Sequence, residues 1–363
     1  MPELPRRVRL VVLFGGVSAE HEVSCVTAAH VLAAADRDRY DLAPIGITRD
    51  GTWVRDDDAA ATLGEGTAAL PDRLEPAGTD VDPIPALRSP DPDLPVVVLP
   101  LLHGPHGEDG TVQGLLELAD VPYVGTGVLG SAVGMDKAMA KVVAAQAGLP
   151  QCRWIEYRAG GSHGNPADLA VRAAAELGFP LFVKPANLGS SVGISKAHDA
   201  AELATAIDSA LSYDEVLVIE EAVAGREIEV GVLGDLDPQA SVPGEIVPGA
   251  EFYDYDDKYL HDRAQLRIPA ELPDAAADEV RALAVRAFVS LRASGMARVD
   301  FFYEADGRGW LLNEINTIPG FTPQSMYPKL WEATGVPYAE LIDRLVGLAL
   351  ARHERRSHFS TKR

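Results

Sequence analysis

Two carboxylates in the C-terminal part of the chain are spaced so that they can face each other across a β-hairpin. In "ARVDFFYEADGRGWLLNEINTI", two strand-like runs flank a turn that we centre on Gly307. With that centre, Asp300 lies opposite Glu314, and Arg298 lies opposite Asn316. Because side chains alternate between the faces of a strand, one face is expected to carry Arg298, Asp300, Phe302, Leu312, Glu314 and Asn316.

This face is suited to hold a divalent cation. Two facing carboxylates repel each other unless they share a proton or hold a cation between them. The amide oxygen of Asn316 adds a third oxygen ligand, which suits Mg²⁺ bound together with a phosphate. A slip of one residue would separate the carboxylates, and charges of an edge strand facing water are the alternative. The same alternation turns Asn313 to the other face.

A glycine-rich loop offers a site for a phosphate. The segment "FPLFVKPANLGSSVGISKA" predicts a buried strand that ends near Lys184, a loop of small residues and a second strand. Backbone N–H groups of small residues can approach a phosphate closely, and the hydroxyls of Ser190 and Ser191 add donors. The P-loop motif is absent. Alone, this segment fits an ordinary flexible hairpin equally well, and the distant magnesium site favours the phosphate.

A second glycine motif is interpreted as structural. The stretch "GTGVLG" at residues 125–130 matches the dinucleotide-binding pattern. However, the strand before it is very short, and no clear strand ends in an acidic residue about 20 positions later. We therefore interpret this motif as a turn into the next helix.

The elements that must position these residues alternate between strand and helix, which predicts an α/β protein. Residues 8–14 read as a buried strand, followed by a helix with Ser18 as N-cap and Glu20 and Glu22 in its first turns. In such domains, ligands gather at the carboxyl ends of the strands. Residues 50–95 are rich in Asp, Pro, Ala and Gly and predict a long, irregular surface excursion. A buried strand then returns in "LPVVVLPLLHGPHGEDG", with a helix and a short strand in "GLLELADVPYVG".

A helix over residues 136–147, ended by Gly148 and Pro150, is a candidate domain boundary. The second unit is predicted to mix strands and helices, in the order "CRWIEY", "DLAVRAAAELG", "FPLFVKP", "VGISKA", "AELATAIDSALS" and "EVLVIEEAV". A third unit begins near "REIEVGVLG" and runs to a C-terminal helix, "PYAELIDRLVGLALARHERR".

Length and charge exclude several classes of protein. A chain of 363 residues is too long for one ordinary core, so we expect two or three domains. A net charge of −22 argues against nucleic acid or an anionic membrane as a partner. No stretch approaches the ~18 apolar residues that span a bilayer, and the N-terminal apolar run reads as a strand rather than a signal peptide. With only Cys25 and Cys152, a reduced cytoplasm fits.

Seven ordered motifs identify a family. They are "VLFGGVSAEHEVS", "LHGPHGEDGTVQGLLE", "GMDKAMAK", "VKPANLGSSVGISK", "FYDYDDKY", "RVDFF" and "NEINTIPGF". The chain closely resembles the D-alanine–D-alanine ligases of the ATP-grasp family, over nearly its full length apart from residues 50–95 and the C-terminal tail.

The resemblance implies a three-domain ATP-grasp fold. An N-terminal α/β domain with a parallel sheet, residues 1–125, would bind substrate. Two α+β domains, residues 126–221 and 222–363, would hold ATP between them. The resemblance also implies a cytoplasmic enzyme that commonly forms homodimers. Magnesium would assist it, usually as two ions for which manganese can substitute. Activation by a monovalent cation stays open.

The implied reaction has two steps. ATP phosphorylates the carboxylate of a first D-alanine. The amine of a second D-alanine then attacks the acyl phosphate, which gives D-alanyl-D-alanine, ADP and phosphate. The dipeptide is a precursor of bacterial peptidoglycan. A carboxylate needs a leaving group before an amine can attack it, and phosphoryl transfer needs positive charge near the oxygens, so the residues agree with this reaction.

The motifs also imply roles for individual residues. Those that match magnesium ligands are Asp300, Glu314 and Asn316. Those that match ATP-binding positions are Lys137, Lys184, Ser191, Glu220, Glu221, Val223, Glu227, Lys258 and Phe302.

The remaining matches concern the substrates. Glu20 matches the group that binds the ammonium of the first substrate, and His103 lies near that substrate. Arg298 and the N–H of Gly320 match the groups that stabilise the oxyanion. Matches to the second-substrate site are Ser325 and Met326.

A mobile loop is expected to close over the site. Tyr259 in "YDYDDKY" matches the residue of that loop that is linked by hydrogen bonds to Ser190 and Glu20. Closure would exclude water from a hydrolysable acyl phosphate.

Three alternatives to this function remain. The near one is a D-alanine–D-lactate ligase, although relatives of that kind lack the Tyr-Lys pairing that "DDKYL" retains. The second is a nucleotide-binding regulator without catalysis, which would lack a ligand or a lid residue. The third is an ATP-grasp ligase for another acid and amine.

Overall fold

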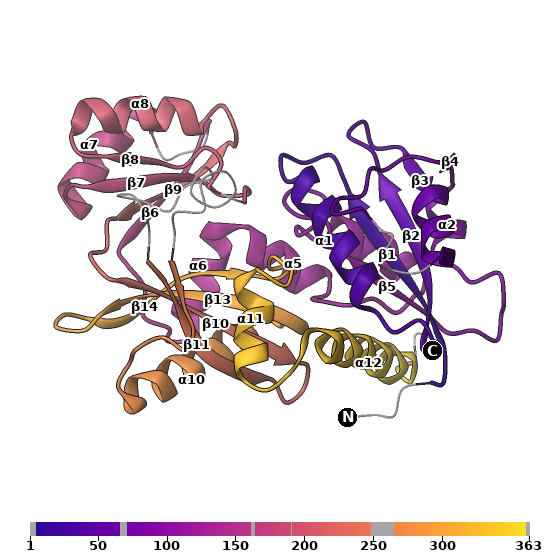
Figure 1. Cartoon of the computed structure of the whole chain (residues 1–363). Helices are drawn as coiled ribbons and strands as arrows, with labels where there is room; N and C mark the ends of the chain where they lie inside the picture. The colour runs from indigo at the N-terminus through magenta and orange to yellow at the C-terminus, as the bar shows by residue number, and fades with distance from the viewer. Residues whose placement is uncertain (1–4, 66–70, 161–163, 190, 248–264, 361–363) are drawn as a thin grey trace.

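The computed structural model describes residues 5–65, 71–160, 164–189, 191–247 and 265–360. The strands in these ranges form three sheets that follow one another along the chain (Figure 1). The mixed α/β class predicted from the sequence is confirmed. The domain boundaries that we assigned remain predictions. No helix within the described ranges is long and apolar enough to cross a membrane.

The N-terminal sheet has the strand order β4-β3-β2-β1-β5. Its parallel part consists of β1 (Val8–Gly15), β2 (Tyr40–Ile47) and β5 (Val96–Pro100). In β1, Val8, Leu10, Val12 and Phe14 enter one buried cluster, whereas Val11 and Leu13 enter another. Both faces are therefore covered, which explains why β1 is a continuous apolar run.

Helices cover both faces of this sheet. Helix α1 (His21–Ala34) packs on one face, and α4 (Thr111–Leu118) packs on the other. Ser18 does not cap α1 as predicted. The helix begins at His21, and the Ser18 hydroxyl accepts a hydrogen bond from the N–H of Glu20 at 3.1 Å. This bond forms a turn just before the helix. Glu20, and not Ser18, is therefore the N-cap residue of α1, and it is buried.

The prediction of an irregular excursion over residues 50–95 was wrong. This segment adds the antiparallel strands β3 (Trp53–Arg55) and β4 (Thr79–Asp80) to the edge of the sheet. It also forms α2 (Asp57–Glu65) and α3 (Pro83–Ala86). The isolated apolar residues Leu74 and Leu87 are buried, and they anchor the segment despite its polar composition.

Two helices lead from the N-terminal sheet to the central part of the chain. The "GTGVLG" motif runs into α5 (Val128–Met135), as predicted. A Cβ on Gly130 would lie 2.9 Å from the carbonyl oxygens of Leu291 and Arg292, so this glycine permits close packing rather than nucleotide binding. Helix α6 (Lys137–Gln146) follows, with Asp136 as its N-cap.

The central sheet has the order β6-β9-β7-β8 and is antiparallel throughout. Its strands are β6 (Trp154–Arg158), β7 (Leu181–Pro185), β8 (Ser195–Ala197) and β9 (Val216–Glu221). Helices α7 (Pro166–Leu177) and α8 (Ala200–Ala210) pack together on one face (Figure 1). The other face carries the residues that alternate with this core.

The C-terminal sheet has the order β12-β11-β10-β13-β14 and is also antiparallel. Its strands are β10 (Arg226–Gly234), β11 (Gln239–Val247), β12 (Gln265–Arg267), β13 (Gly295–Glu304) and β14 (Gly309–Asn316). Helix α10 (Asp274–Ser290) covers one face, and α11 (Met326–Ala333) packs against β10 and β11.

The last helix, α12 (Tyr338–Ser357), packs against both the N-terminal and the C-terminal part of the chain. It lies between the N-terminal and C-terminal sheets (Figure 1) and contacts α1, β5, β10 and β13. Its buried face shares one apolar cluster with β1, with Met296 of β13 and with Trp331 of α11. The N-terminal sheet is thus attached to the C-terminal sheet through a continuous core.

The hairpin of β13 and β14 has the predicted pairing, but for a different reason. Asp300 pairs with Glu314, and Arg298 pairs with Asn316. At the turn, however, Glu304 pairs with Gly309, and that register alone would place Asp300 opposite Asn313. A β-bulge at Asn313 shifts the pairing by one residue and brings the two carboxylates together.

The bulge also changes which side chains share a face. Leu312 lies opposite Phe301 and joins the buried cluster under α10, so our prediction that it shares the face of Glu314 was wrong. Asn313, which simple alternation turned away, lines the same cavity as Glu314.

Candidate functional site

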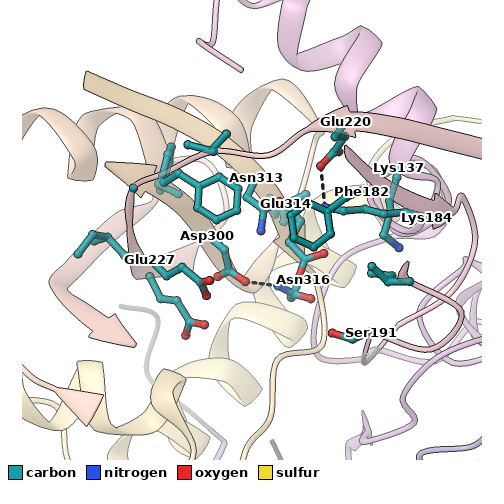
Figure 2. A pocket seen from close by; sticks show the side chains of 18 of the residues that line it. Lys137, Phe182, Lys184, Ser191, Glu220, Glu227, Asp300, Asn313, Glu314 and Asn316 are labelled. Carbon is teal, nitrogen blue, oxygen red and sulfur yellow. Dashed lines mark hydrogen bonds and ion pairs between the residues drawn. The ribbon is translucent and has the colours of Figure 1, made fainter. Parts of the chain in front are cut away.

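A cavity of about 870 Å³ lies between the central and the C-terminal sheet (Figure 2). Each sheet packs one face against helices, and the polar side chains of its other face line the cavity. The cavity brings together many of the residues singled out from the sequence: Lys137, Lys184, Ser191, Glu220, Glu221, Val223, Glu227, Arg298, Asp300, Phe302, Glu314 and Asn316.

One wall of the cavity holds a buried cluster of charges. Lys184 Nζ is 2.7 Å from Oε2 of Glu220 and 3.5 Å from Oδ1 of Asn313. Burial alone would lower the pKa of Lys184, but Glu220 outweighs this effect and raises the pKa, so the lysine stays charged. Burial alone would raise the pKa of Glu220, yet Lys141 and Lys184 together lower it to about 2.

Two residues of this wall were not predicted. Asn313 lies in this wall because of the bulge, and no local pattern in the sequence predicts that bulge. Phe182 pairs with Glu220 across the central sheet, and the ammonium groups of Lys184 and Lys196 lie 5.9 and 5.8 Å from its ring centroid. Phe182 is two residues before Lys184 in β7, so period-two alternation could have placed it on the same face.

The glycine loop forms the next part of the wall. The Nζ of Lys137 donates a hydrogen bond to the carbonyl oxygen of Leu188, and the Lys137 N–H donates to Ala186 at 3.1 Å. Lys137 is thereby held against the base of the loop. Ser191 lines the cavity with φ of +60°, in the left-handed region. Ser190 lies outside the described residues.

The segment predicted to surround adenine and ribose begins at Glu220 and continues along the cavity. The Glu221 side chain forms ion pairs with Arg153, at 2.7 Å, and with Arg308. Its carboxylate is therefore already paired with two arginines in the substrate-free protein. Glu227 and Phe302 are paired neighbours on β10 and β13, and both line the cavity.

Arg298 organises the carboxylates of the C-terminal sheet. Its Nε and Nη2 donate to the two oxygens of Asp300 at 2.8 and 2.6 Å, and Nε is 2.9 Å from Oε2 of Glu229. Burial alone would lower its pKa, but Asp300 and Glu229 raise that pKa well above the ordinary value. Glu229 was not predicted, although it follows Glu227 by two residues in "REIEVGVLG" and pairs with Asp300.

The donor set of Asp300, Glu314 and Asn316 fits a magnesium ion. The three side chains lie close together in Figure 2, with Lys137 and Lys184 beyond Glu314 in this view. Asn316 Nδ2 donates to Asp300 Oδ2 at 2.9 Å, so a metal would be met by the amide oxygen after a 180° turn of this group. Within the described residues, no three acidic, His or Cys side chains are placed so that they could hold a metal ion by themselves, so phosphate and water oxygens would complete the coordination.

An acidic cluster adjoins the cavity on the side of the N-terminal sheet. Glu20, His103 and Glu108 are all buried. A Cβ on Gly189 would lie 3.0 Å from Oε2 of Glu20 and 3.9 Å from Oε2 of Glu108, so both carboxylates approach the glycine loop. Burial lowers the pKa of His103 despite Glu20, which leaves a neutral imidazole at neutral pH. A buried carboxylate, a second acidic group and a neutral histidine together suit the ammonium group of a small substrate.

Comparisons with known proteins agree with this geometry. The D-ala D-ala ligase N-terminus family matches residues 9–126, and the D-ala D-ala ligase C-terminus family matches residues 143–347. The chain belongs to the D-alanine–D-alanine ligase family. The resemblance inferred from the seven motifs is thus confirmed.

Individual members of this family match along nearly the full chain. The curated D-alanine–D-alanine ligase of Geobacillus thermodenitrificans is 47% identical over 365 residues, covering 96% of this chain and 97% of that protein. The solved D-alanine-D-alanine ligase of Coxiella burnetii has a TM-score of 0.81 at 34% identity, covering 97% of both chains. The solved D-Ala:D-Ser ligase VanG of Enterococcus faecalis has a TM-score of 0.78 at 32% identity, covering 94% of this chain and 99% of that chain. These likenesses confirm the ATP-grasp fold.

Glu108 is a residue of this ligase-family site that the sequence reasoning missed. It stands in "HGPHGEDG", and its Oε2 accepts a hydrogen bond from the Gly104 N–H at 2.7 Å. Burial, followed by the charge of Glu20, raises the pKa of Glu108 to about 8. The signal that could have indicated it is a carboxylate inside a glycine-rich motif directly after a buried strand.

The raised pKa of Glu108 predicts a pH-dependent stability. A carboxyl group with a folded pKa above its unfolded value contributes stability that is present below pH 4.5 and lost as the pH rises through about 8. The substituted protein Glu108→Gln cannot ionise there. In substrate-free protein with EDTA, we expect its Tm to fall less than that of the parent between pH 5.5 and 8.5, by on the order of 5 °C.

The matched control for this prediction is Glu332→Gln on the exposed side of α11. Its Tm should change with pH in the same way as the Tm of the parent. Identical pH dependence of Tm in Glu108→Gln and the parent would show that Glu108 is already ionised at neutral pH.

The residues predicted to contact the second substrate lie after β14. A Cβ on Gly320 would be 3.1 Å from the Ser325 hydroxyl, so these residues adjoin. Ser325 Oγ accepts a hydrogen bond from the Thr322 N–H at 3.1 Å, and Ser325 is the N-cap residue of α11. The Met326 side chain is buried with Ile246 in a small apolar cluster, which leaves only its backbone for a substrate. Their substrate contacts remain predictions.

The expected mobile loop falls outside the described residues. Lys258 and Tyr259 belong to the range 248–264, and their partner Ser190 is also outside. Their predicted roles, and the argument that "DDKYL" favours an amine acceptor, stay predictions.

Proposed function

We propose that the protein joins two D-alanine molecules into D-alanyl-D-alanine in an ATP-dependent reaction that passes through D-alanyl phosphate. The observation that carries the proposal is the combination of charged groups around one site. Lys137 and Lys184 supply positive charge beside the glycine loop, the Asp300–Glu314 pair supplies negative charge on the C-terminal sheet, and Glu108 lies close enough to both Glu20 and Glu314 to be affected by their charges. The lysines suit a nucleotide phosphate, the Asp300–Glu314 pair suits a divalent cation, and the Glu20 carboxylate suits the ammonium group of an amino acid.

The first step would transfer the terminal phosphoryl group of ATP. An oxygen of the D-alanine carboxylate forms a bond to phosphorus, the bond to ADP breaks, and ADP leaves with the electron pair. Lys137 and Lys184 would hold the phosphates. Asp300, Glu314 and Asn316 would bind magnesium, which supplies positive charge to the phosphate oxygens.

The second step would form the peptide bond. The amine of the second D-alanine, after losing a proton, forms a bond to the acyl carbon, and phosphate leaves with the electrons of the broken C–O bond. Negative charge develops on the acyl oxygen before phosphate leaves. The Arg298 guanidinium and the Gly320 N–H would stabilise it because their positions are set by the sheet and the turn after β14.

The first D-alanine would be held by its ammonium group. The Glu20 carboxylate would pair with this cation, and the positive charge would favour ionisation of the neighbouring Glu108, whose pKa is raised to about 8 in the substrate-free protein. His103 beside them is neutral, so it adds no competing charge. We further propose that the enzyme acts in the cytoplasm as a homodimer and supplies peptidoglycan synthesis.

A phosphate-release assay with a panel of substrates tests the proposed function. With purified protein, ATP and magnesium at neutral pH, D-alanine alone should give equal amounts of phosphate and dipeptide, whereas L-alanine should give neither. Adding D-lactate or D-serine tests the second site by the products formed, identified by mass spectrometry. Faster formation of an ester or of D-alanyl-D-serine would show that our choice of acceptor is wrong. Activity on an unrelated acid without activity on D-alanine would overturn the proposal.

A further inference from the structure

The buried carboxylate of Glu220 is paired with two lysines, although one positive charge would balance it. Lys141 Nζ is 2.8 Å from Oε1 of Glu220, and Lys184 Nζ is 2.7 Å from Oε2. The side chains of Lys141 and Glu220 are 5% and 4% exposed. A buried charge is costly unless it is compensated, so the arrangement of these three charges needs a reason.

The two lysines differ in what else they contact. Lys184 lines the cavity and is 3.5 Å from Asn313 Oδ1. Lys141 comes from α6, is not among the residues that line the cavity, and lies 3.7 Å from the sulfur of Cys152. Lys141 is therefore sealed in the protein, and only Lys184 can meet a ligand.

The sum of the charges suggests what Lys141 does. Glu220 and Lys184 alone would form a neutral pair, and a phosphate approaching Lys184 would compete with the carboxylate for the same ammonium group. With Lys141 present, the charges of the three groups sum to +1. Of the two lysines, Lys184 is the one that lines the cavity, so the net positive charge is available there. Glu220 also keeps a partner if Lys184 turns toward a ligand, so that movement does not leave a buried carboxylate unpaired.

We propose that Lys141 is a positioning residue that holds Glu220, so that the charge of Lys184 is available to the phosphates of the nucleotide. The inference rests on the proposed function only insofar as a polyphosphate enters the cavity. It assigns a role in nucleotide binding to a side chain that contacts no substrate. Its effect should appear in phosphate affinity, and the affinity for D-alanine should be unaffected.

The test uses inorganic tripolyphosphate, which lacks the adenine and therefore reports on phosphate binding alone. In Lys141→Met, Lys184 must serve as the only partner of Glu220. We expect the Kd for tripolyphosphate and the KM for ATP to rise about tenfold or more, with the KM for D-alanine within about twofold of the parent. Lys141→Arg keeps the charge and should bind tripolyphosphate nearly as the parent does.

The double variant Lys141→Met/Glu220→Gln separates this role from simple packing. It removes one positive and one negative charge, so the surplus of +1 returns, and tripolyphosphate binding should recover to within a few fold of the parent. If Lys141 only tethers α6 to β9, the double variant loses the tether as well and shows no recovery. That result, or unchanged binding in folded Lys141→Met, would overturn the inference.

The proposed function is measured separately in the same preparations. Dipeptide formation by the parent decides the ligase activity, whatever the tripolyphosphate series shows. If the parent forms the dipeptide but Lys141→Met binds tripolyphosphate normally, the inference about Lys141 fails and the proposed function stands. Melting curves of each variant without ligand establish that the proteins compared are folded.

Discussion

In the Glu314→Gln variant, the rate of magnesium-dependent phosphate release with D-alanine should be at least about a thousandfold lower than in the parent. Glutamine keeps the shape of the side chain but removes its charge, and Glu314 faces Asp300 directly across the hairpin. The site would then offer a single carboxylate to a divalent cation. Because charge on the ligands sets cation affinity, the magnesium concentration for half-maximal rate should also rise markedly.

The loss in Glu314→Gln should be specific to the metal site. Glu314 is repelled by Asp300 but attracted by Lys184 and Arg298, so the substrate-free variant should have a Tm close to that of the parent. Glu279→Gln on the exposed surface of α10 is the matched control and should retain full turnover. Full turnover in Glu314→Gln at a low magnesium concentration would sink the assignment of this hairpin as the metal site.

The second large effect is expected for Arg298→Met. Arg298 donates to both oxygens of Asp300 and contacts Glu229, and Asp300 faces Glu314 as well. Removing the guanidinium leaves buried negative charges without their partner, which costs about 3–5 kcal/mol of stability. It also removes the cation expected near the acyl oxygen, so we expect kcat to fall about a thousandfold.

A second substitution separates these two consequences. In Arg298→Met/Glu229→Gln, one of the unpaired carboxylates is neutral, so much of the lost unfolding free energy should return. The kcat should not return, since no cation faces the reacting oxygen. Denaturant unfolding and single-turnover kinetics measure the two quantities. Recovery of kcat in the double variant would contradict a role of Arg298 in stabilising the oxyanion.

The hairpin that contains these residues illustrates the limits of local reasoning. We placed the turn on Gly307 and obtained the correct pairing of Asp300 with Glu314. Next to the turn, the observed pairing differs from the predicted one by one residue. The bulge at Asn313 adds one residue to β14, so beyond it the predicted pairing is found. The pairing was correct although the mechanism was not, because two shifts of one residue cancel. The bulge also explains why two side chains lie on the face opposite to the predicted one. Leu312 points into the buried cluster, and Asn313 lines the cavity.

The segment over residues 50–95 shows the opposite error. Its composition favoured loops, and the scarcity of apolar residues hid two strands and two helices. Strands at the edge of a sheet need only a few buried contacts, since the backbone of the neighbouring strand, β2 for β3 and β3 for β4, supplies their hydrogen bonds. Leu74 and Leu87 provide such contacts, and no period in the sequence marks either of them.

The family, the α/β class, most strands and helices, and the chemical types of the residues around the cavity could be predicted from the amino-acid sequence. These follow from ordered motifs and from the two-residue and 3.6-residue periods, which are local properties. Contacts between distant segments were needed to show that Glu108 lies beside Glu20, that Glu229 contacts Arg298, and that Lys141 and Lys184 both pair with Glu220. Burial and charge act through space between segments far apart in the chain, and neither can be read from the spacing within one segment.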